Sequence, residues 1–183
     1  IATGRLHKKS LKQLADAKGS GESERESDSE LHERATQKQP DDLPRLRAQH
    51  AEIAGLTNLP AKILRGTEAD ILADGSIDVP ADILPELDLV IASVHQRYKA
   101  DENAMTERLV KVMRQPFFKI WGHPLGRLIG SRPPLECRMG QVLDAIAESK
   151  CAIEVNGDPH RLDLEPDWIR AARTRGIRFV VST

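Results

Sequence analysis

From residue 43 onward, segments with the pattern of buried strands alternate with segments with the pattern of amphipathic helices. The strand-like segments are 61–72, 88–95, 117–124, 151–159 and 177–183, and the helix-like segments are 43–56, 101–116, 139–149 and 166–176. Strands that alternate with helices of this length are typical of βα units, which build parallel sheets. The alternation therefore predicts an α/β protein with either an open doubly wound sheet or a closed barrel.

We favour the barrel because the chain lacks the glycine-rich GxGxxG turn that follows the first strand of a dinucleotide-binding sheet. Two helix signals support the assignment of the elements. Leu43, Leu46, His50 and Ile53 share one face of the first predicted helix, where His50 is expected to pack rather than to react. Asp101 is the predicted N-cap of the second helix.

Composition limits the class of protein. The 183 residues suffice for one sizeable domain, and with only 3% aromatic residues the core must be aliphatic. The net charge of −1 provides no overall attraction to nucleic acid, although a local basic groove remains open. Cys137 and Cys151 have no CxxC spacing and fit a reducing cytoplasm, and no apolar run reaches the roughly 18 residues of a membrane span.

The chain divides into three regions by composition. Residues 18–42 are polar and charged without apolar periodicity, and we expect them to form a flexible insertion. Residues 1–17 and 43–183 then belong to one domain, as its start and its main body. Because the sequence begins and stops within strand-like patterns, we expect this domain to be truncated at both ends.

Polar residues follow the apolar part of four predicted strands. In chain order they are Glu68 and Asp70, His95, His123, and Glu154 with Asn156. Carboxyl ends of parallel strands meet at one edge of the sheet, where α/β proteins hold their active sites. A carboxylate with two imidazoles suits Zn²⁺, Mn²⁺ or Fe²⁺. The alternative is that the carboxylates are solvated strand ends and that the histidines make structural hydrogen bonds.

A second set of residues could contact a phosphate-containing substrate. Arginine guanidinium groups are well shaped to donate hydrogen bonds to phosphate oxygens, although a role in keeping the surface soluble also explains arginines at these positions. Asn156 could orient a substrate or only hydrogen-bond the backbone near Gly157, and His160 could contact a substrate or be only a turn residue. Trp121 is most simply a core residue. The chain has no serine or cysteine in a nucleophile elbow. The arginines near the predicted strand ends are Arg127, Arg132 and Arg161.

Four motifs resemble a known family. "LRGTEADILADGSIDVP", "DLVIASVHQRY", "GHPLGRLIGSRPP" and "EVNGDPHRLDL" stand in this order. In order and separation they are similar to the PHP (polymerase and histidinol phosphatase) domain, particularly the form at the carboxyl end of bacterial and archaeal family X DNA polymerases. The resemblance implies a distorted (β/α)₇ barrel, incomplete in this chain, with up to three divalent metal ions, Mn²⁺ or Zn²⁺.

The resemblance also implies metal ligands. It assigns Glu68 as a glutamate that bridges metals, and His95 and His123 as ligands. Aligning "LHKKSL" with the family's "DHSKSL" adds His7, with Leu6 where aspartate is usual. The family's HxH and Asp-x-His motifs are not in this chain.

The function that the resemblance implies is a metal-dependent phosphoesterase. In the polymerase-linked form this is manganese-dependent 3′–5′ exonucleolytic processing of DNA, with a polymerase domain in the same native chain. In free-standing relatives it is hydrolysis of a phosphomonoester such as histidinol phosphate. The other alternative is a non-catalytic structural or interaction module of a polymerase.

Overall fold

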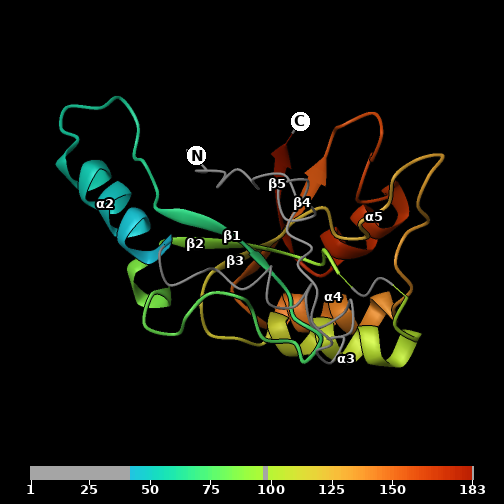
Figure 1. Cartoon of the computed structure of the whole chain (residues 1–183). Coiled ribbons are helices and arrows are strands. Elements are labelled where there is room, and N and C mark those ends of the chain that lie inside the picture. The colour runs from blue at the N-terminus through green and yellow to red at the C-terminus, as the bar shows by residue number, and fades with distance from the viewer. Residues whose placement is uncertain (1–41, 97–98, 183) are drawn as a thin grey trace, which may run out of the picture.

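The computed structural model describes residues 42–96 and 99–182 (Figure 1). His7 and residues 18–41 of the insertion predicted over residues 18–42 lie outside the described residues, so their roles stay predictions. Asp42, the last residue of that predicted insertion, is instead the first residue of a helix. Among the described residues, no helix has both the length and the apolar character needed to cross a membrane.

Within the described ranges, the sheet has five parallel strands in the order of the chain, β1-β2-β3-β4-β5. This confirms the predicted α/β class. Each strand lies beside the next one along the chain, without the reversal of strand order found in a doubly wound sheet. The arrangement is consistent with part of a barrel, and closure into seven units stays a prediction. The strands are β1 Gly66–Asp70, β2 Leu89–Ser93, β3 Lys119–Trp121, β4 Cys151–Asn156 and β5 Arg178–Ser182.

β1 is shorter than the 61–72 segment predicted. Among the described residues, its ladder with β2 runs only from the pair Gly66–Leu89 to the pair Asp70–Ser93, so the predicted segment extends beyond the ladder at both ends. β3 is likewise limited to Lys119–Trp121, although the Gly122 N–H still donates to the Ala92 carbonyl at 3.0 Å.

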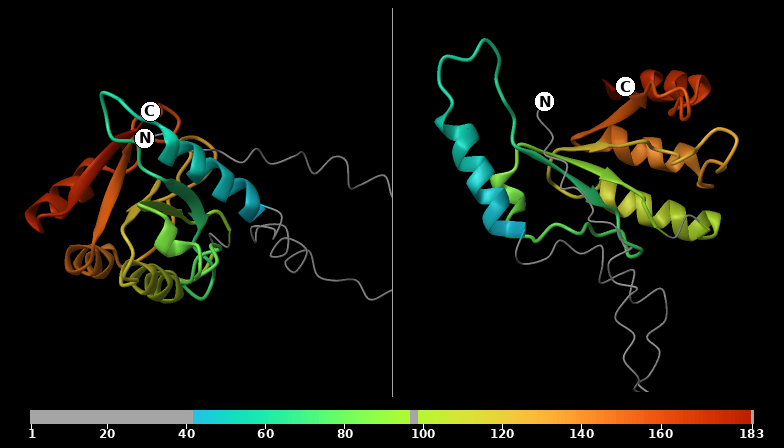
Figure 2. Two further views of the ribbon diagram at one scale, coloured as in Figure 1. Left: turned by 90° about the vertical axis from the view of Figure 1, so that its left-hand side faces the viewer. Right: turned by 45° about the horizontal axis from the view of Figure 1, so that its top comes forward.

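Three helices cover one face of the sheet: α3 Glu102–Met113, α4 Met139–Glu148 and α5 Pro166–Thr174 (Figure 2). The carboxylate of Asp101 accepts hydrogen bonds from the N–H groups of Asn103 and Ala104, both at 3.0 Å, which confirms it as the N-cap of α3. The helix α2, Asp42–Gly55, lies apart from these three, near β1 (Figures 1 and 2).

Apolar side chains pack on both faces of the sheet. The larger cluster lies toward the helices and includes Trp121, which has no exposed surface and is a core residue as predicted. A smaller cluster, centred on Leu89, Ile120 and Ala152, lies on the opposite face. Because side chains alternate along a strand, Glu68 and Glu154 project on the face of this smaller cluster.

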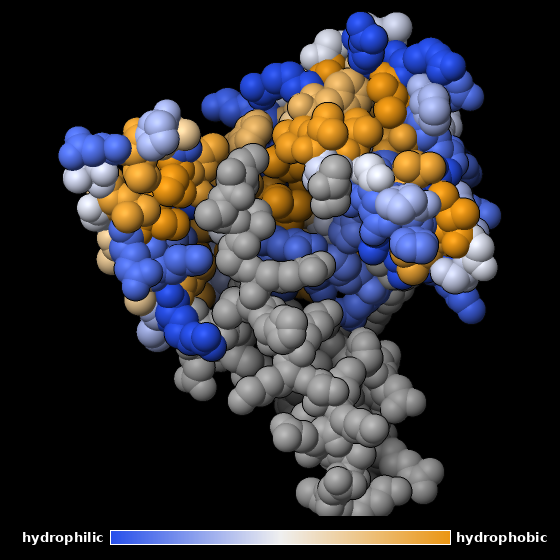
Figure 3. Space-filling view, turned by 90° about the horizontal axis from the view of Figure 1, so that it is seen from above, coloured by the Kyte–Doolittle hydropathy of each residue, from blue (hydrophilic) through white to orange (hydrophobic). Residues whose placement is uncertain are grey.

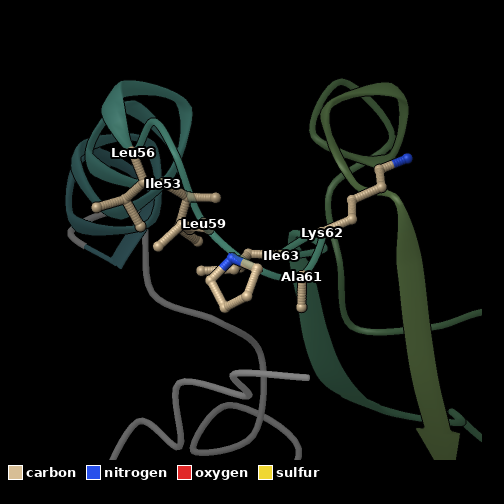
Figure 4. A pocket seen from close by; sticks show the side chains of 7 residues that line it. Ile53, Leu56, Leu59, Ala61, Lys62 and Ile63 are labelled. Atoms are coloured by element: carbon tan, nitrogen blue, oxygen red, sulfur yellow. The ribbon is translucent and has the colours of Figure 1, made fainter.

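A hollow of about 400 Å³ follows α2. It is lined mainly by apolar side chains, and Lys62 extends away from them (Figure 4). Apolar side chains also gather over α2 and its loop in the space-filling view (Figure 3). Leu56 and Leu59 are exposed there, but the hollow contains none of the strand-end residues described below.

Candidate metal centre

Three neighbouring strands bring Glu68, His95 and His123 together. Glu68 lies within β1, while His95 and His123 stand two residues beyond the last residues of β2 and β3. One ligand atom from each residue lies within 4.8 Å of the others. These are the three ligands predicted within the described part of the chain.

The ring nitrogens of the two histidines face each other. His95 Nε2 lies 3.1 Å from His123 Nε2 and 3.4 Å from Glu68 Oε1. The ring centroids are 5.0 Å apart, with an angle of 60° between the ring planes. One carboxylate oxygen and two imidazole nitrogens that converge in this way fit the ligand preferences of Zn²⁺ or Mn²⁺.

The two histidines differ in charge. Burial lowers the pKa of His95, but hydrogen bonds and negative charge from Asp70 and Glu68 outweigh burial and raise it to about 9. Burial lowers the pKa of His123, and the positive charges of His95 and Arg161 act in the same direction. Without a metal at neutral pH, the pair therefore consists of a charged His95 and a neutral His123.

Asp70 contacts the other side of the His95 ring. Its Oδ1 lies within hydrogen-bonding distance of His95 Nδ1, and its side chain is only 14% exposed. A carboxylate on the second ring nitrogen orients a metal-binding histidine and increases its basicity. The sequence placed Asp70 at a strand end but assigned it no role. The sequence feature that could have indicated this role is the position of Asp70 two residues after Glu68, which places both side chains on the same face of β1.

The backbone around His123 is unusual. An added Cβ at Gly122 would lie 2.5 Å from Ser93 Oγ, so the close approach of the strands requires glycine. His123 itself has a φ of 29°, in the left-handed region that non-glycine residues seldom occupy. Glu154 Oε2 accepts a hydrogen bond from the His123 N–H.

Comparison with known proteins identifies relatives of two kinds, and no protein-family model matches the chain. The chain is 37% identical over 122 residues to the DNA polymerase/3′-5′ exonuclease PolX of Bacillus subtilis, a match that covers 67% of this chain and 21% of that protein. It is 35% identical over 99 residues to a probable phosphatase of Caldanaerobacter subterraneus, covering 52% of this chain and 37% of that protein. A probable phosphatase of Aliivibrio fischeri is 36% identical over 96 residues, covering 51% and 36%.

The chain is similar to a polymerase/exonuclease and to probable phosphatases. It spans well under half the length of each of these relatives.

Two of the predicted substrate arginines are engaged by the protein itself. Arg127 donates from Nε to the Arg161 carbonyl at 2.6 Å and pairs through Nη1 with Glu165. Arg132 donates from Nε to the Gly126 carbonyl at 2.6 Å. Both contacts join loop segments near His123, and a role in phosphate binding stays a prediction for these two residues.

The other predicted substrate residues lie on the segment that follows β4. Arg161 is half-buried, and its Nη1 has no hydrogen-bond partner among the described residues. Asn156 Oδ1 accepts from the Asp158 N–H at 3.0 Å, so this side chain stabilises the turn. His160 is exposed in the same turn, and its N–H donates to Asp158 Oδ1 at 2.8 Å.

Proposed function

We propose that this chain carries the metal centre of a PHP-type phosphoesterase. The observation that supports this most is the convergence of Glu68 Oε1 and the two imidazole nitrogens at the carboxyl ends of adjacent parallel strands. Similarity to a polymerase/exonuclease and to probable phosphatases points to phosphoester substrates. His7 is a further proposed ligand, outside the described residues.

Divalent ions at such a centre supply Lewis acidity, which activates water and stabilises charge on a transferring phosphoryl group. In this proposal Glu68, His95 and His123 hold the ions. Asp70 keeps Nδ1 of His95 occupied, so that Nε2 faces the metal. Arg161 contributes positive charge close enough to lower the pKa of His123, and its Nη1, which has no hydrogen-bond partner within the part of the chain that the structure describes, is the arginine donor that we propose for a phosphate oxygen.

The substrate we favour is DNA, processed from its 3′ end, in a native protein that also contains a polymerase domain. The relative with the longest match described above is a polymerase with 3′-5′ exonuclease activity. The second candidate is a small phosphomonoester, which the similarity to probable phosphatases supports. Asn156, His160, Arg127 and Arg132 are proposed to border this substrate.

The test combines metal content with two assays. The chain is loaded with Mn²⁺ or Zn²⁺ and assayed on 3′-labelled single-stranded DNA and on p-nitrophenyl phosphate. Glu68→Ala and His123→Ala should lose metal and lower the preferred activity at least 100-fold, whereas Glu107→Ala, on the exposed side of α3, should retain both. The assignment is wrong if metal content and activity are unchanged in the first two variants. Absence of both metal binding and cleavage in the wild-type chain would favour the non-catalytic module.

A further inference from the structure

The loop that carries His123 is held in place by side chains from other segments, which accept hydrogen bonds from its backbone N–H groups. Within the loop, the Gly126 N–H donates to the His123 carbonyl at 2.8 Å and closes a tight turn. This turn begins at a residue with positive φ, which a histidine adopts only when its surroundings compensate for the strain. Two carboxylates from other segments accept hydrogen bonds from the N–H groups of His123, Leu125 and Gly126.

Glu154 is the first of these carboxylates. It lies on β4, and its Oε2 accepts from the His123 N–H. Its Oε1 accepts from the hydroxyl of Ser182 on β5. Both oxygens are therefore engaged by the protein, and the side chain connects the His123 loop with two strands.

Asp163 is the second carboxylate. It has no exposed surface, and its Oδ2 accepts from the N–H groups of Leu125 at 2.9 Å and Gly126 at 3.1 Å. Asp163 is itself held beside the end of β4, because its N–H donates to the Asn156 carbonyl at 3.2 Å. A buried carboxylate that accepts two backbone N–H groups fixes both peptide units at once.

We propose that Glu154 and Asp163 are positioning residues, which hold the His123 backbone so that its imidazole faces Glu68 and His95. This inference rests on the proposed metal centre and deepens it. Glu154 acts on the metal through His123 and is not a ligand itself. The sequence does not separate these roles, since a glutamate at a strand end is equally suited to bind an ion.

Amide variants distinguish an N–H acceptor from a metal ligand. A glutamine at position 154 can still accept from the His123 N–H through Oε1, and its amide can donate to Ser182 Oγ. Mn²⁺ affinity, measured on the whole chain by electron paramagnetic resonance of the free ion, should therefore stay within about threefold in Glu154→Gln. It should fall about 10- to 100-fold in Glu154→Ala and in Asp163→Ala, and to a smaller extent in Asp163→Asn. Glu68→Gln provides the reference for a lost ligand.

Amide hydrogen exchange supplies a measurement that does not depend on metal. The His123 N–H should exchange at least tenfold faster in Glu154→Ala than in the wild type, and at nearly the wild-type rate in Glu154→Gln. Asp144→Ala, which removes an exposed ion pair with Arg175, should change neither measurement.

Two results would overturn the inference. If Glu154→Gln loses Mn²⁺ as completely as Glu68→Gln, Glu154 is a ligand. If Glu154→Ala leaves His123 exchange unchanged, the carboxylate does not hold the loop. Failure of the wild-type chain to bind Mn²⁺ would instead count against the proposed function, and the exchange experiment would still decide the role of Glu154.

Discussion

Asp70 and His95 form a hydrogen-bonded pair in which the carboxylate Oδ1 contacts ring Nδ1 and leaves Nε2 directed at Glu68 and His123. Asp70 is the last residue of β1 and His95 follows β2, the neighbouring strand, so the parallel ladder brings the two residues close together. This pairing specifies which nitrogen of His95 can meet an ion. It also explains why His95 holds its proton so tightly when no ion is bound.

Removing the carboxylate of Asp70 should therefore affect His95 directly. In Asp70→Asn we expect the pKa of His95 to fall from about 9 toward its ordinary value. The substitution removes a negative charge and the hydrogen bond that does most to raise this pKa. We expect Zn²⁺ affinity to fall about 10- to 100-fold in Asp70→Ala. NMR titration of the imidazole measures the first effect and calorimetry the second. Asp74→Asn, at an exposed carboxylate, is the control, and an unchanged His95 pKa in Asp70→Asn would contradict the pairing.

The pKa of His95 also predicts how stability depends on pH. Its folded value of about 9 lies above the value of about 6.5 in an unfolded chain, so the folded state binds this proton more tightly. The resulting stability is fully present below about pH 6.5 and is lost as pH rises through about 9. With a chelator present, the free energy of unfolding should fall between pH 7 and pH 9, by up to about 2 kcal/mol.

Urea unfolding at pH 7, 8 and 9 measures this fall, and His95→Gln should remove most of it. The raised pKa of Asp163, about 6 because of burial, acts at lower pH and does not enter this window. An equal fall in wild type and His95→Gln would show that another group is responsible.

Local patterns predicted the elements and placed Glu68, His95 and His123 at the ends of neighbouring strands, because apolar periodicity and strand-end position are properties of short segments. They did not predict Asp163, which stands in a non-periodic segment and acts on Leu125 and Gly126, 38 and 37 residues away. Arg127 shows the same limit. Its residue type suggests phosphate binding, whereas its carbonyl partners are known only once the loops are folded together.

Gly122 provides a test of how closely β2 and β3 must approach. In Gly122→Ala the new Cβ would lie 2.5 Å from Ser93 Oγ and 2.7 Å from Ile91 Cγ2, so the strands or side chains must shift. We expect a loss of about 1–3 kcal/mol in the free energy of unfolding, together with weaker Mn²⁺ binding because His123 follows directly. Gly140→Ala is the matched control. It has no atom within 4 Å of its added Cβ and should be neutral or up to about 1 kcal/mol more stable by urea unfolding. Equal effects of the two substitutions would contradict the close approach.

Arg108 joins the segments that follow β1, which contains Glu68, and β2, which precedes His95. It lies on α3, is 5% exposed, and donates to the carbonyls of Leu72 at 2.9 Å, Gln96 at 3.0 Å and Ile71. Arg108→Met should lower the free energy of unfolding by about 3 kcal/mol, because these carbonyls lose charged donors in a poorly solvated position.

Arg108→Lys should recover little of this loss, since one ammonium group cannot reproduce the separated donors of a guanidinium. Arg114→Met is the control near the end of the same helix. Its ion pair with Glu148 at 3.6 Å is exposed, and its removal should cost less than about 0.5 kcal/mol. Urea unfolding of the three variants measures these differences. If Arg108→Lys were as stable as the wild type, a single positive charge would suffice, and the hydrogen bonds to separate carbonyls would not be what holds the two segments together.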